Sequence, residues 1–217
     1  MSPSGANHSP TFIEENRLYA RGVKLVAGID EAGRGALAGS VVAAAVILPP
    51  EITASWLGEI RDSKQLPPSA REYYYDFIKE AAVAIGVGIY DNVAVDGHGI
   101  LAATRMAMKQ AIGKLSPAPE YLLIDYLELR DVPIPQKGIT FGDSLCVSIA
   151  CASIVAKVSR DRMMRALEEQ YPGYGFTRNK GYGTQEHLAG LRRLGPCRVH
   201  RRSFRPVKTC LPEAHEQ

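Results

Sequence analysis

The chain has 217 residues, 46% of them hydrophobic and 23% charged, and a formal net charge of +3. These values predict an ordinary soluble protein with one sizeable core and at most a small appendage. The longest purely apolar run, residues 41–48, covers less than half of the roughly 20 residues that a membrane helix needs, so we expect a cytoplasmic protein that does not associate with membranes.

The two ends of the chain differ from its middle in composition. Residues 1–18 are polar and lack the basic start and apolar stretch of a secretion signal, so we expect a disordered N-terminal arm. Residues 171–217 contain nine basic and three acidic residues, whereas the rest of the chain contains 17 basic and 20 acidic residues. This segregation suits either a polyanion-binding surface beside an acidic centre or a solvated basic tail.

Apolar segments alternate with turn signals along the chain, a pattern typical of a mixed α/β domain. We expect strands at residues 23–30, 40–48, 83–90 and 121–125. We expect helices at residues 67–82, 100–115, 144–170 and 184–194. The first two strands are apolar throughout, which places them centrally in the sheet. The small residues in the first half of 144–170 predict close packing of that helix against the sheet.

The cysteines and histidines show no metal-binding pattern. The cysteines, which form no CxxC pair, are Cys146, Cys151, Cys197 and Cys210, and the five histidines are scattered. We therefore expect free thiols and no zinc site.

Four acids stand at the end of a predicted strand or at the entrance to a predicted helix: Asp30, Glu31, Asp125 and Asp143. Ligand crevices form at this edge of open α/β sheets. Each acid alone has an ordinary explanation, either as a helix N-cap or as a solvated strand-end residue. Together, two carboxylates about 4 Å apart repel each other by roughly 4 kcal/mol at an effective dielectric of about 20, so they need a cation. Oxygen ligands without Cys or His favour Mg²⁺ or Mn²⁺, which suits metal-assisted phosphodiester hydrolysis.

The segment GIDEAGRG, residues 28–35, raises a geometric question. Successive strand residues point to opposite faces, so Asp30 and Glu31 reach one metal only if the strand ends or twists between them. Gly33 and Gly35 permit a sharp turn, and they flank Arg34, whose guanidinium and neighbouring N–H groups suit a phosphate or sugar. The alternative of a dinucleotide-binding turn is disfavoured, because GxGxxxG misses that fingerprint and the acids would repel a pyrophosphate.

The chain resembles the ribonuclease HII family, the bacterial type 2 ribonucleases H. In family order, the resemblance is carried by GIDEAGRG at 28–35, DSKQL at 62–66, YLLID at 121–125, GDSLCVSIACASIVAKVSRD at 142–161, and YPGYGFTRNKGYGT with RRSF between 171 and 204. It implies a ribonuclease H-like α/β fold with a mixed central sheet flanked by helices. The catalytic domain would span residues 19–170, and a small helical substrate-binding element would span 171–217.

The resemblance also implies an activity and a set of site residues. The activity is Mg²⁺- or Mn²⁺-dependent endonucleolytic cleavage of RNA in RNA/DNA hybrids, with incision 5′ of single ribonucleotides in duplex DNA, which starts ribonucleotide removal. The implied residues are the active-site acids Asp30, Glu31, Asp125 and Asp143, the junction-reading loop Gly33, Arg34 and Gly35, its partner Tyr182, the phosphate contacts Lys64 and Lys180, and a structural Asp161.

Some positions depart from the family pattern. Ala36 stands where proline is common, Tyr126 where glycine usually follows the aspartate, Phe141 where lysine often precedes the other aspartate, and residues 97–99 read differently from the usual pattern. A ring at Tyr126 is expected to crowd the metal site, which keeps open the alternative of a non-cleaving nucleic-acid-binding homologue with the same fold.

For the cleaving enzyme we predict two divalent ions roughly 4 Å apart, bridged by the scissile phosphate and Asp30. One ion activates water and the other stabilises the departing 3′ oxygen, which leaves a 3′-hydroxyl and a 5′-phosphate. Asp125 is expected to ligate metal directly, Glu31 to ligate metal or position water and the 2′-hydroxyl, and Asp143 to be a more mobile ligand. We expect a monomer whose basic C-terminal region gives substrate binding a steep salt dependence. The basic residues expected to bind substrate there are Arg178, Lys180, Arg192, Arg193, Arg201 and Arg202.

Overall fold

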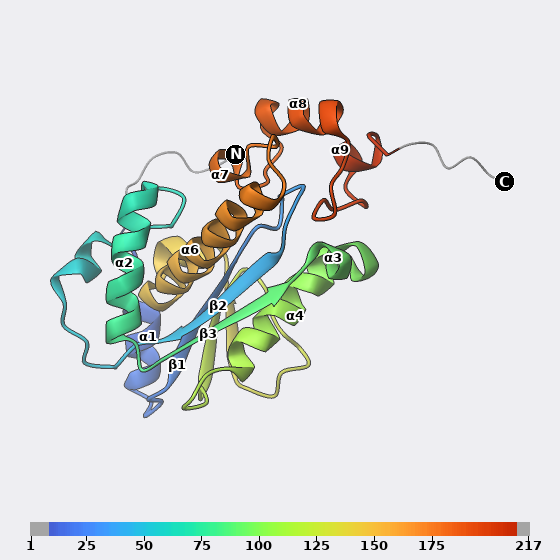
Figure 1. Cartoon of the computed structure of the whole chain (residues 1–217). Coiled ribbons are helices and arrows are strands. Elements are labelled where there is room, and N and C mark those ends of the chain that lie inside the picture. The colour runs from blue at the N-terminus through green and yellow to red at the C-terminus, as the bar shows by residue number, and fades with distance from the viewer. Residues whose placement is uncertain (1–8, 212–217) are drawn as a thin grey trace.

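A computed structural model describes residues 9–211 of the chain. Its centre is a five-stranded sheet in the order β3-β2-β1-β4-β5 (Figure 1). The strands are β1 (Val26–Ala32), β2 (Val41–Ile47), β3 (Ala84–Tyr90), β4 (Tyr121–Asp125) and β5 (Gln136–Ile139). The first three strands form an antiparallel meander, whereas β4 and β5 run parallel to β1. The expected mixed sheet is therefore confirmed, with β1 at its centre.

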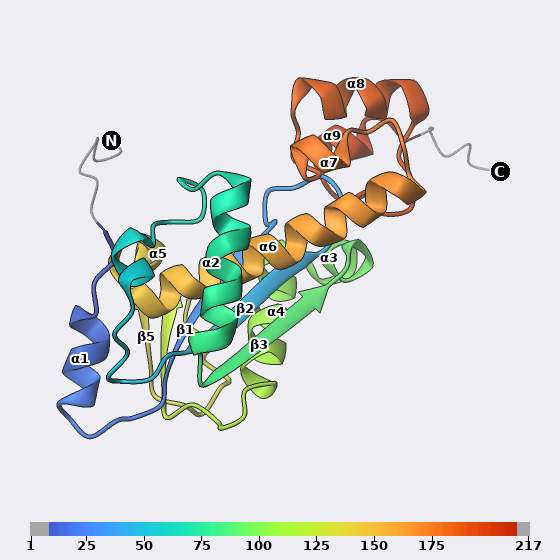
Figure 2. The same cartoon turned by 60° about the vertical axis from the view of Figure 1, so that its left-hand side comes forward.

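Helices cover both faces of the sheet and extend beyond one end of it. The longer helices are α2 (Pro68–Ala81), α4 (Ile100–Gly113), α6 (Val147–Gln170) and α8 (Gln185–Leu194). The shorter ones are α1 (Ile13–Tyr19), the 3-10 helix η1 (Ser55–Glu59), α3 (Asn92–His98), α5 (Gly142–Leu145), α7 (Phe176–Asn179) and α9 (Arg205–Lys208). Figure 2 shows α6 and α2 on one side of the sheet and α4 on the other. The C-terminal helices α7 to α9 lie together beyond the end of α6.

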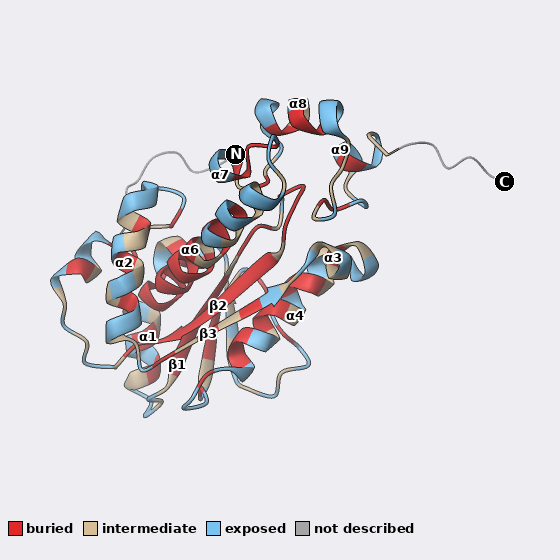
Figure 3. Cartoon of the chain, viewed as in Figure 1, coloured by how far each residue is buried: buried red, intermediate tan, exposed pale blue. Residues whose placement is uncertain are grey.

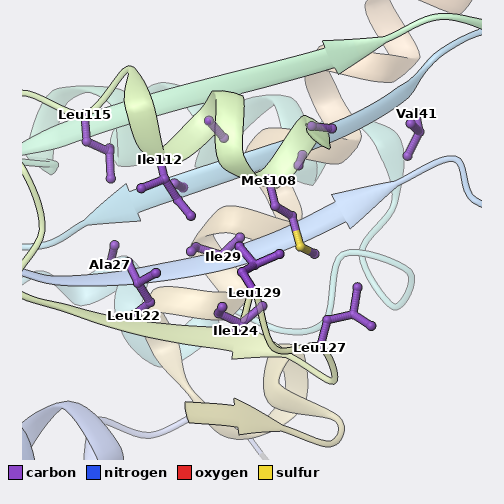
Figure 4. Packing of buried hydrophobic residues seen from close by; sticks show 14 of the residues in the cluster. Ala27, Ile29, Val41, Met108, Ile112, Leu115, Leu122, Ile124, Leu127 and Leu129 are labelled. Carbon is purple, nitrogen blue, oxygen red and sulfur yellow. The ribbon is translucent and has the colours of Figure 1, made fainter. Parts of the chain in front are cut away.

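The long helix α6 packs directly on β1, as its small residues predict. Gly28 permits this approach, because a Cβ at that position would lie 2.1 Å from the backbone carbonyl carbon of Ser148. On the opposite face, Met108 and Ile112 of α4 pack over the sheet in one continuous apolar cluster (Figure 4). Buried residues line the strands and the inner faces of the helices, and exposed residues line the outer faces (Figure 3). These two layers hold the end of β1 in a fixed place.

The expectation of a disordered arm over residues 1–18 is wrong for its second half. Residues 13–19 form α1, and Glu15 within it is buried. The Glu15 carboxylate accepts hydrogen bonds from the backbone N–H and the hydroxyl of Ser148, at 2.9 and 2.7 Å. A tertiary contact therefore orders a segment whose local composition is polar. Residues 1–8 lie outside the described residues.

Other element boundaries also differ from the expectations. The helix expected at 144–170 is two helices, because Cys146 is extended (φ −116°, ψ 129°) between α5 and α6. The first strand begins later than expected and continues through Glu31 to Ala32. The helices α3, α7 and α9 were not expected, because four to seven residues carry too little periodicity to announce a helix. Thr184 caps α8, its hydroxyl accepting from the His187 N–H.

Two expectations about the whole chain are also tested by these residues. All four cysteines are free, as expected. Within residues 9–211, no helix combines the length and the apolar character needed to cross a bilayer.

Candidate active site

Asp30, Glu31 and Asp125 lie together at the ends of two neighbouring parallel strands. Asp30 and Glu31 belong to β1, and Asp125 is the last residue of β4. The parallel register pairs Ile29 with Ile124, so the next residue along each strand, Asp30 and Asp125, lies at the same edge of the sheet. The topology thus brings together acids that are about a hundred residues apart in the chain.

These three acids line one cavity of about 780 Å³. The same cavity is lined by further residues expected at the site, namely Gly33, Arg34, Gly35, Lys64 and Tyr182. Residues that the sequence analysis did not single out also line it, among them Ser63, Arg71, Ser153, Lys157 and Phe204. The cavity therefore lies where the sheet edge, the glycine loop and the C-terminal element meet.

The sequence predicts that the strand ends or twists between Asp30 and Glu31, and the structure shows that it does not end there. Both residues pair with β2, Asp30 opposite Ala44 and Glu31 opposite Ala43, so their side chains leave opposite faces of the sheet. Asp30 points to the same face of the sheet as Gly28, which α6 covers, and Ser153 of α6 lines the same cavity. Both acids nevertheless line the same cavity.

Asp30 is in an unfavourable place for a negative charge. Its side chain is buried, with only 3% of the residue exposed, and one carboxylate oxygen accepts the Glu31 backbone N–H at 2.7 Å. Burial raises the pKa of Asp30 well above its usual range, and the charges of Glu31 and Asp125 raise this pKa further. A cation in the cavity would reverse this penalty.

Only one of the two carboxylate oxygens of Glu31 has a hydrogen-bond partner within residues 9–211. Arg34 donates to its Oε1 at 3.2 Å, whereas its Oε2 is buried and has no hydrogen-bond partner within residues 9–211. Burial raises the pKa of Glu31, although Arg34 opposes this shift. A buried oxygen without a partner costs free energy unless a ligand supplies one. This oxygen is therefore a candidate ligand atom for a bound cation.

Asp125 lies close to Asp143, because the residue before Asp143 donates a hydrogen bond to the Asp125 carboxylate. The Gly142 N–H donates to Asp125 Oδ1 at 2.8 Å, and burial, followed by repulsion from Asp143, raises the pKa of Asp125. Asp143 is buried in the first turn of α5 and accepts from Lys64 Nζ at 3.1 Å. Asp143 is not among the residues that line the cavity. Asp143 therefore lies outside the cavity that the other three acids line, and it is paired with Lys64.

In the described part of the chain, no three acidic, histidine or cysteine side chains are already arranged to hold one ion. Two of these acids have hydrogen-bond partners: Lys64 donates to Asp143, and the Gly142 N–H donates to one oxygen of Asp125. The donor set itself fits a hard divalent cation, because it consists of carboxylate oxygens, one of them unpartnered and buried.

The buried Arg160 packs against the loop after β1 that contains Gly33, Arg34 and Gly35, called the glycine loop below. Gly33 has φ +93°, and a Cβ there would lie 2.0 Å from Arg160 Nε, so only glycine fits. Arg160 donates to the carbonyl oxygens of Ser40, Ala38 and Lys180 at 2.9 to 3.1 Å. This one guanidinium therefore ties the loop region to the turn that carries Tyr182.

A second buried arginine holds the loop from the C-terminal side. Arg201 donates to the carbonyl oxygens of Arg34 and Gly39, at 2.9 and 3.0 Å. Arg201 is expected from the sequence to bind substrate, and Arg160 has no expected role, because a basic residue near a binding surface is ordinarily assigned to phosphate or solvent. Arg160 is 1% exposed and Arg201 is fully buried, so both serve the interior of the protein.

Tyr182 lies between this loop and α6. Its ring is 5.3 Å from the Arg160 guanidinium and 5.8 Å from the Lys157 ammonium, within the range of cation–π contacts. Its carbonyl oxygen lies 3.0 Å from Nδ1 of the buried His187. Lys157 in turn pairs with Asp161 at 2.5 Å. The ring of Tyr182 is thus placed by contacts with two basic side chains of α6.

Tyr126 does not lie where the sequence predicts, and the role of Lys180 as a phosphate contact stays a prediction. Lys180 lies outside the cavity and bonds the carbonyl oxygen of Thr177. The ring of Tyr126 does not crowd the metal site, because Tyr126 has a left-handed backbone (φ +61°), is 65% exposed and lines a different hollow. Phe141, with φ +58°, is likewise exposed outside the cavity. Crowding of the metal site by Tyr126 was the reason to consider a non-cleaving homologue, and the structure does not support that reason.

Comparison with known proteins places the chain in a family. The family model of ribonuclease HII matches residues 27–207, which include Asp30, Glu31, Asp125 and Asp143. The chain belongs to the ribonuclease HII family. The chain is 53% identical over 200 residues to the ribonuclease HII of Dehalococcoides mccartyi strain 195, covering 92% of this chain and 95% of that protein. Membership makes the chain a ribonuclease H, an endonuclease that hydrolyses phosphodiester bonds in RNA.

Solved structures give the same fold at lower identity. The ribonuclease H2 of Pyrococcus horikoshii OT3 superposes with a TM-score of 0.71 at 23% identity, covering 86% of this chain and 96% of that one. Bst-RNase HIII in complex with Mn²⁺ superposes with a TM-score of 0.65 at 22% identity, covering 96% of this chain and 75% of that one. These likenesses confirm the ribonuclease H-like fold.

Proposed function

We propose that this chain hydrolyses the RNA strand of RNA/DNA hybrids and incises duplex DNA on the 5′ side of single embedded ribonucleotides. The observation that carries the proposal is the cavity in which three acids with raised pKa values face the glycine loop and Tyr182. A role in ribonucleotide removal is a prediction that rests on this activity. A cytoplasmic location is a separate prediction.

The residues that would hold divalent metal are Asp30, Glu31, Asp125 and Asp143. When Mg²⁺ or Mn²⁺ is bound, it supplies an activated water and charge stabilisation at the scissile phosphate. The buried Oε2 of Glu31 and the raised pKa of Asp30 support this assignment, since both features are relieved by a cation. Two ions in the catalytic complex remain part of the proposal.

The other residues of the cavity would bind and orient the substrate. The Lys64 side chain is 74% exposed although it pairs with Asp143, so its ammonium is accessible to a substrate phosphate. The backbone at Gly35 has open space where a Cβ would stand, which leaves room for a sugar or phosphate. Arg34 and Tyr182 line the same cavity and would read the 2′-hydroxyl, the group that distinguishes RNA from DNA.

The decisive experiment offers a labelled DNA duplex with one embedded ribonucleotide, together with Mg²⁺, Mn²⁺ or a chelator, and maps the cut. We expect metal-dependent incision 5′ of the ribonucleotide, with a 3′-hydroxyl and a 5′-phosphate as products. The matched control is the same duplex with deoxyribose at every position, which must stay intact. Binding without cleavage in either metal would instead favour the non-cleaving homologue.

A further inference from the structure

Two aromatic residues flank the acidic edge of the sheet without taking part in the core. Tyr126 follows Asp125 directly, and Phe141 precedes Gly142, whose N–H donates to the Asp125 carboxylate. The two segments are held together, since the Tyr126 N–H donates to the Ile139 carbonyl oxygen at 3.0 Å. Tyr126 is 65% and Phe141 is 64% exposed, so both rings face solvent beside the candidate active site.

Both residues have a backbone conformation that favours glycine. Their φ angles are +61° and +58°, in the left-handed region that costs an L-residue free energy. Glycine would adopt this conformation without that cost. Burial of the two rings does not offset this free-energy cost, since both rings are exposed. Strained residues that gain nothing from packing are typical of functional surfaces.

Tyr126 also opens onto a second hollow, of about 710 Å³, on the side of the sheet where α4 lies. Basic side chains in it are Arg105 and Lys109 of α4 and Arg130 of the loop after β4; the acidic ones are Glu128 and Asp131. Lys109 pairs with Asp131, while within residues 9–211 no ion pair engages Arg105 or Arg130. The hollow thus offers two uncommitted guanidinium groups beside an exposed ring, which suits a phosphate backbone.

We propose that Tyr126 and Phe141 form an aromatic rim that packs against the sugars and bases of the substrate strand as it leaves the acidic cavity. Arg105 and Arg130 would contact the phosphates of the same strand. The rim meets the cavity at Asp125, and aromatic faces contact nucleotides of any sequence. A nucleic acid fits this surface better than a protein partner, because charged rather than apolar side chains surround the Tyr126 ring. The inference rests on the proposed function.

The test compares the wild type with Tyr126→Gly, Phe141→Gly and the double variant. Binding of a fluorescein-labelled RNA/DNA hybrid is measured by anisotropy in chelator, and KM and kcat are measured in Mg²⁺. We expect each variant to weaken binding and raise KM by roughly tenfold, with kcat within about twofold of wild type. The melting temperature should not fall, because glycine relieves the left-handed backbone.

Two further variants separate the ring from other effects. Tyr126→Phe keeps the aromatic face and should bind as the wild type does. Tyr73→Ala removes an exposed ring of α2 that lines neither hollow, and it should leave hybrid binding unchanged. Binding by the double variant within twofold of wild type would overturn the inference and point to a protein partner. A wild type that neither binds nor cuts the hybrid would refute the proposed function itself.

Discussion

A buried pair of histidines couples the stability of the C-terminal element to pH. Nε2 of His187 and Nε2 of His200 lie 3.0 Å apart, and both residues are fully buried. The backbone N–H of Cys197 donates to His200 Nδ1, and the Tyr182 carbonyl oxygen accepts from His187 Nδ1, each at 3.0 Å. Because a backbone N–H only donates and a carbonyl only accepts, His200 must carry its proton on Nε2 and donate it to His187 Nε2.

This chain of hydrogen bonds leaves no nitrogen free to accept another proton. Burial, together with repulsion from His187, lowers the pKa of His200 from 6.5 to about 4. Burial also lowers the pKa of His187. The unfolded state therefore binds more protons than the folded state between pH 6.5 and 4, so stability falls as the pH falls through this window. For His200 the loss is about 3 kcal/mol at most.

The assay is urea unfolding at several pH values between 7.5 and 4, with wild type and His200→Gln compared. The comparison is necessary because Asp30, Glu31 and Asp125 have raised pKa values and pull stability the other way. We expect the variant to be less stable at neutral pH and to approach the wild type as the pH falls to 4. Imidazole NMR should show the His200 proton on Nε2. Parallel pH profiles of the two proteins, or titration of His200 near 6.5, would refute the reasoning.

Three other predictions follow from the site. Asp125→Asn keeps the shape but removes the charge, so Mg²⁺-dependent cleavage should fall at least about a hundredfold with an unchanged circular dichroism spectrum; full activity would remove Asp125 from the metal site. Gly33→Ala places a Cβ 2.0 Å from Arg160 Nε at φ +93°, and urea unfolding should show a loss of about 1–3 kcal/mol, whereas Gly35→Ala meets open space and should lose less. Mn²⁺ affinity measured by calorimetry should rise with pH, because Asp30 must lose its proton to bind metal; a flat profile between pH 5 and 8 would contradict the raised pKa.

Much of the sheet could be predicted from local sequence. The segment 121–125 is β4 as expected, and Pro68 and Thr184 mark the starts of α2 and α8. These elements carry strong local signals, namely apolar runs, an N-terminal proline and a capping hydroxyl. The order of the acids along the chain, with the glycines after the first pair, was also readable, and it led to the correct family.

Other features depend on contacts between distant segments. The polar helix α1 forms where Glu15 reaches Ser148, and no local pattern announces that partner. Arg160 and Arg201 resemble surface charges in the sequence, yet they are buried because backbone carbonyl oxygens surround them. The direction of the Tyr126 ring was also unpredictable, since a left-handed φ at a strand end turns the side chain away from the cavity.

The sequence by itself therefore determined which chemical groups the protein possesses and which strands carry them. Only the tertiary structure decided that Asp30, Glu31 and Asp125 share one cavity while Asp143 stands behind them with Lys64. The physical reason is that residue type and spacing specify local backbone preferences. The distances between charges that set pKa values and create a metal site arise only when β1, β4 and α5 pack against one another.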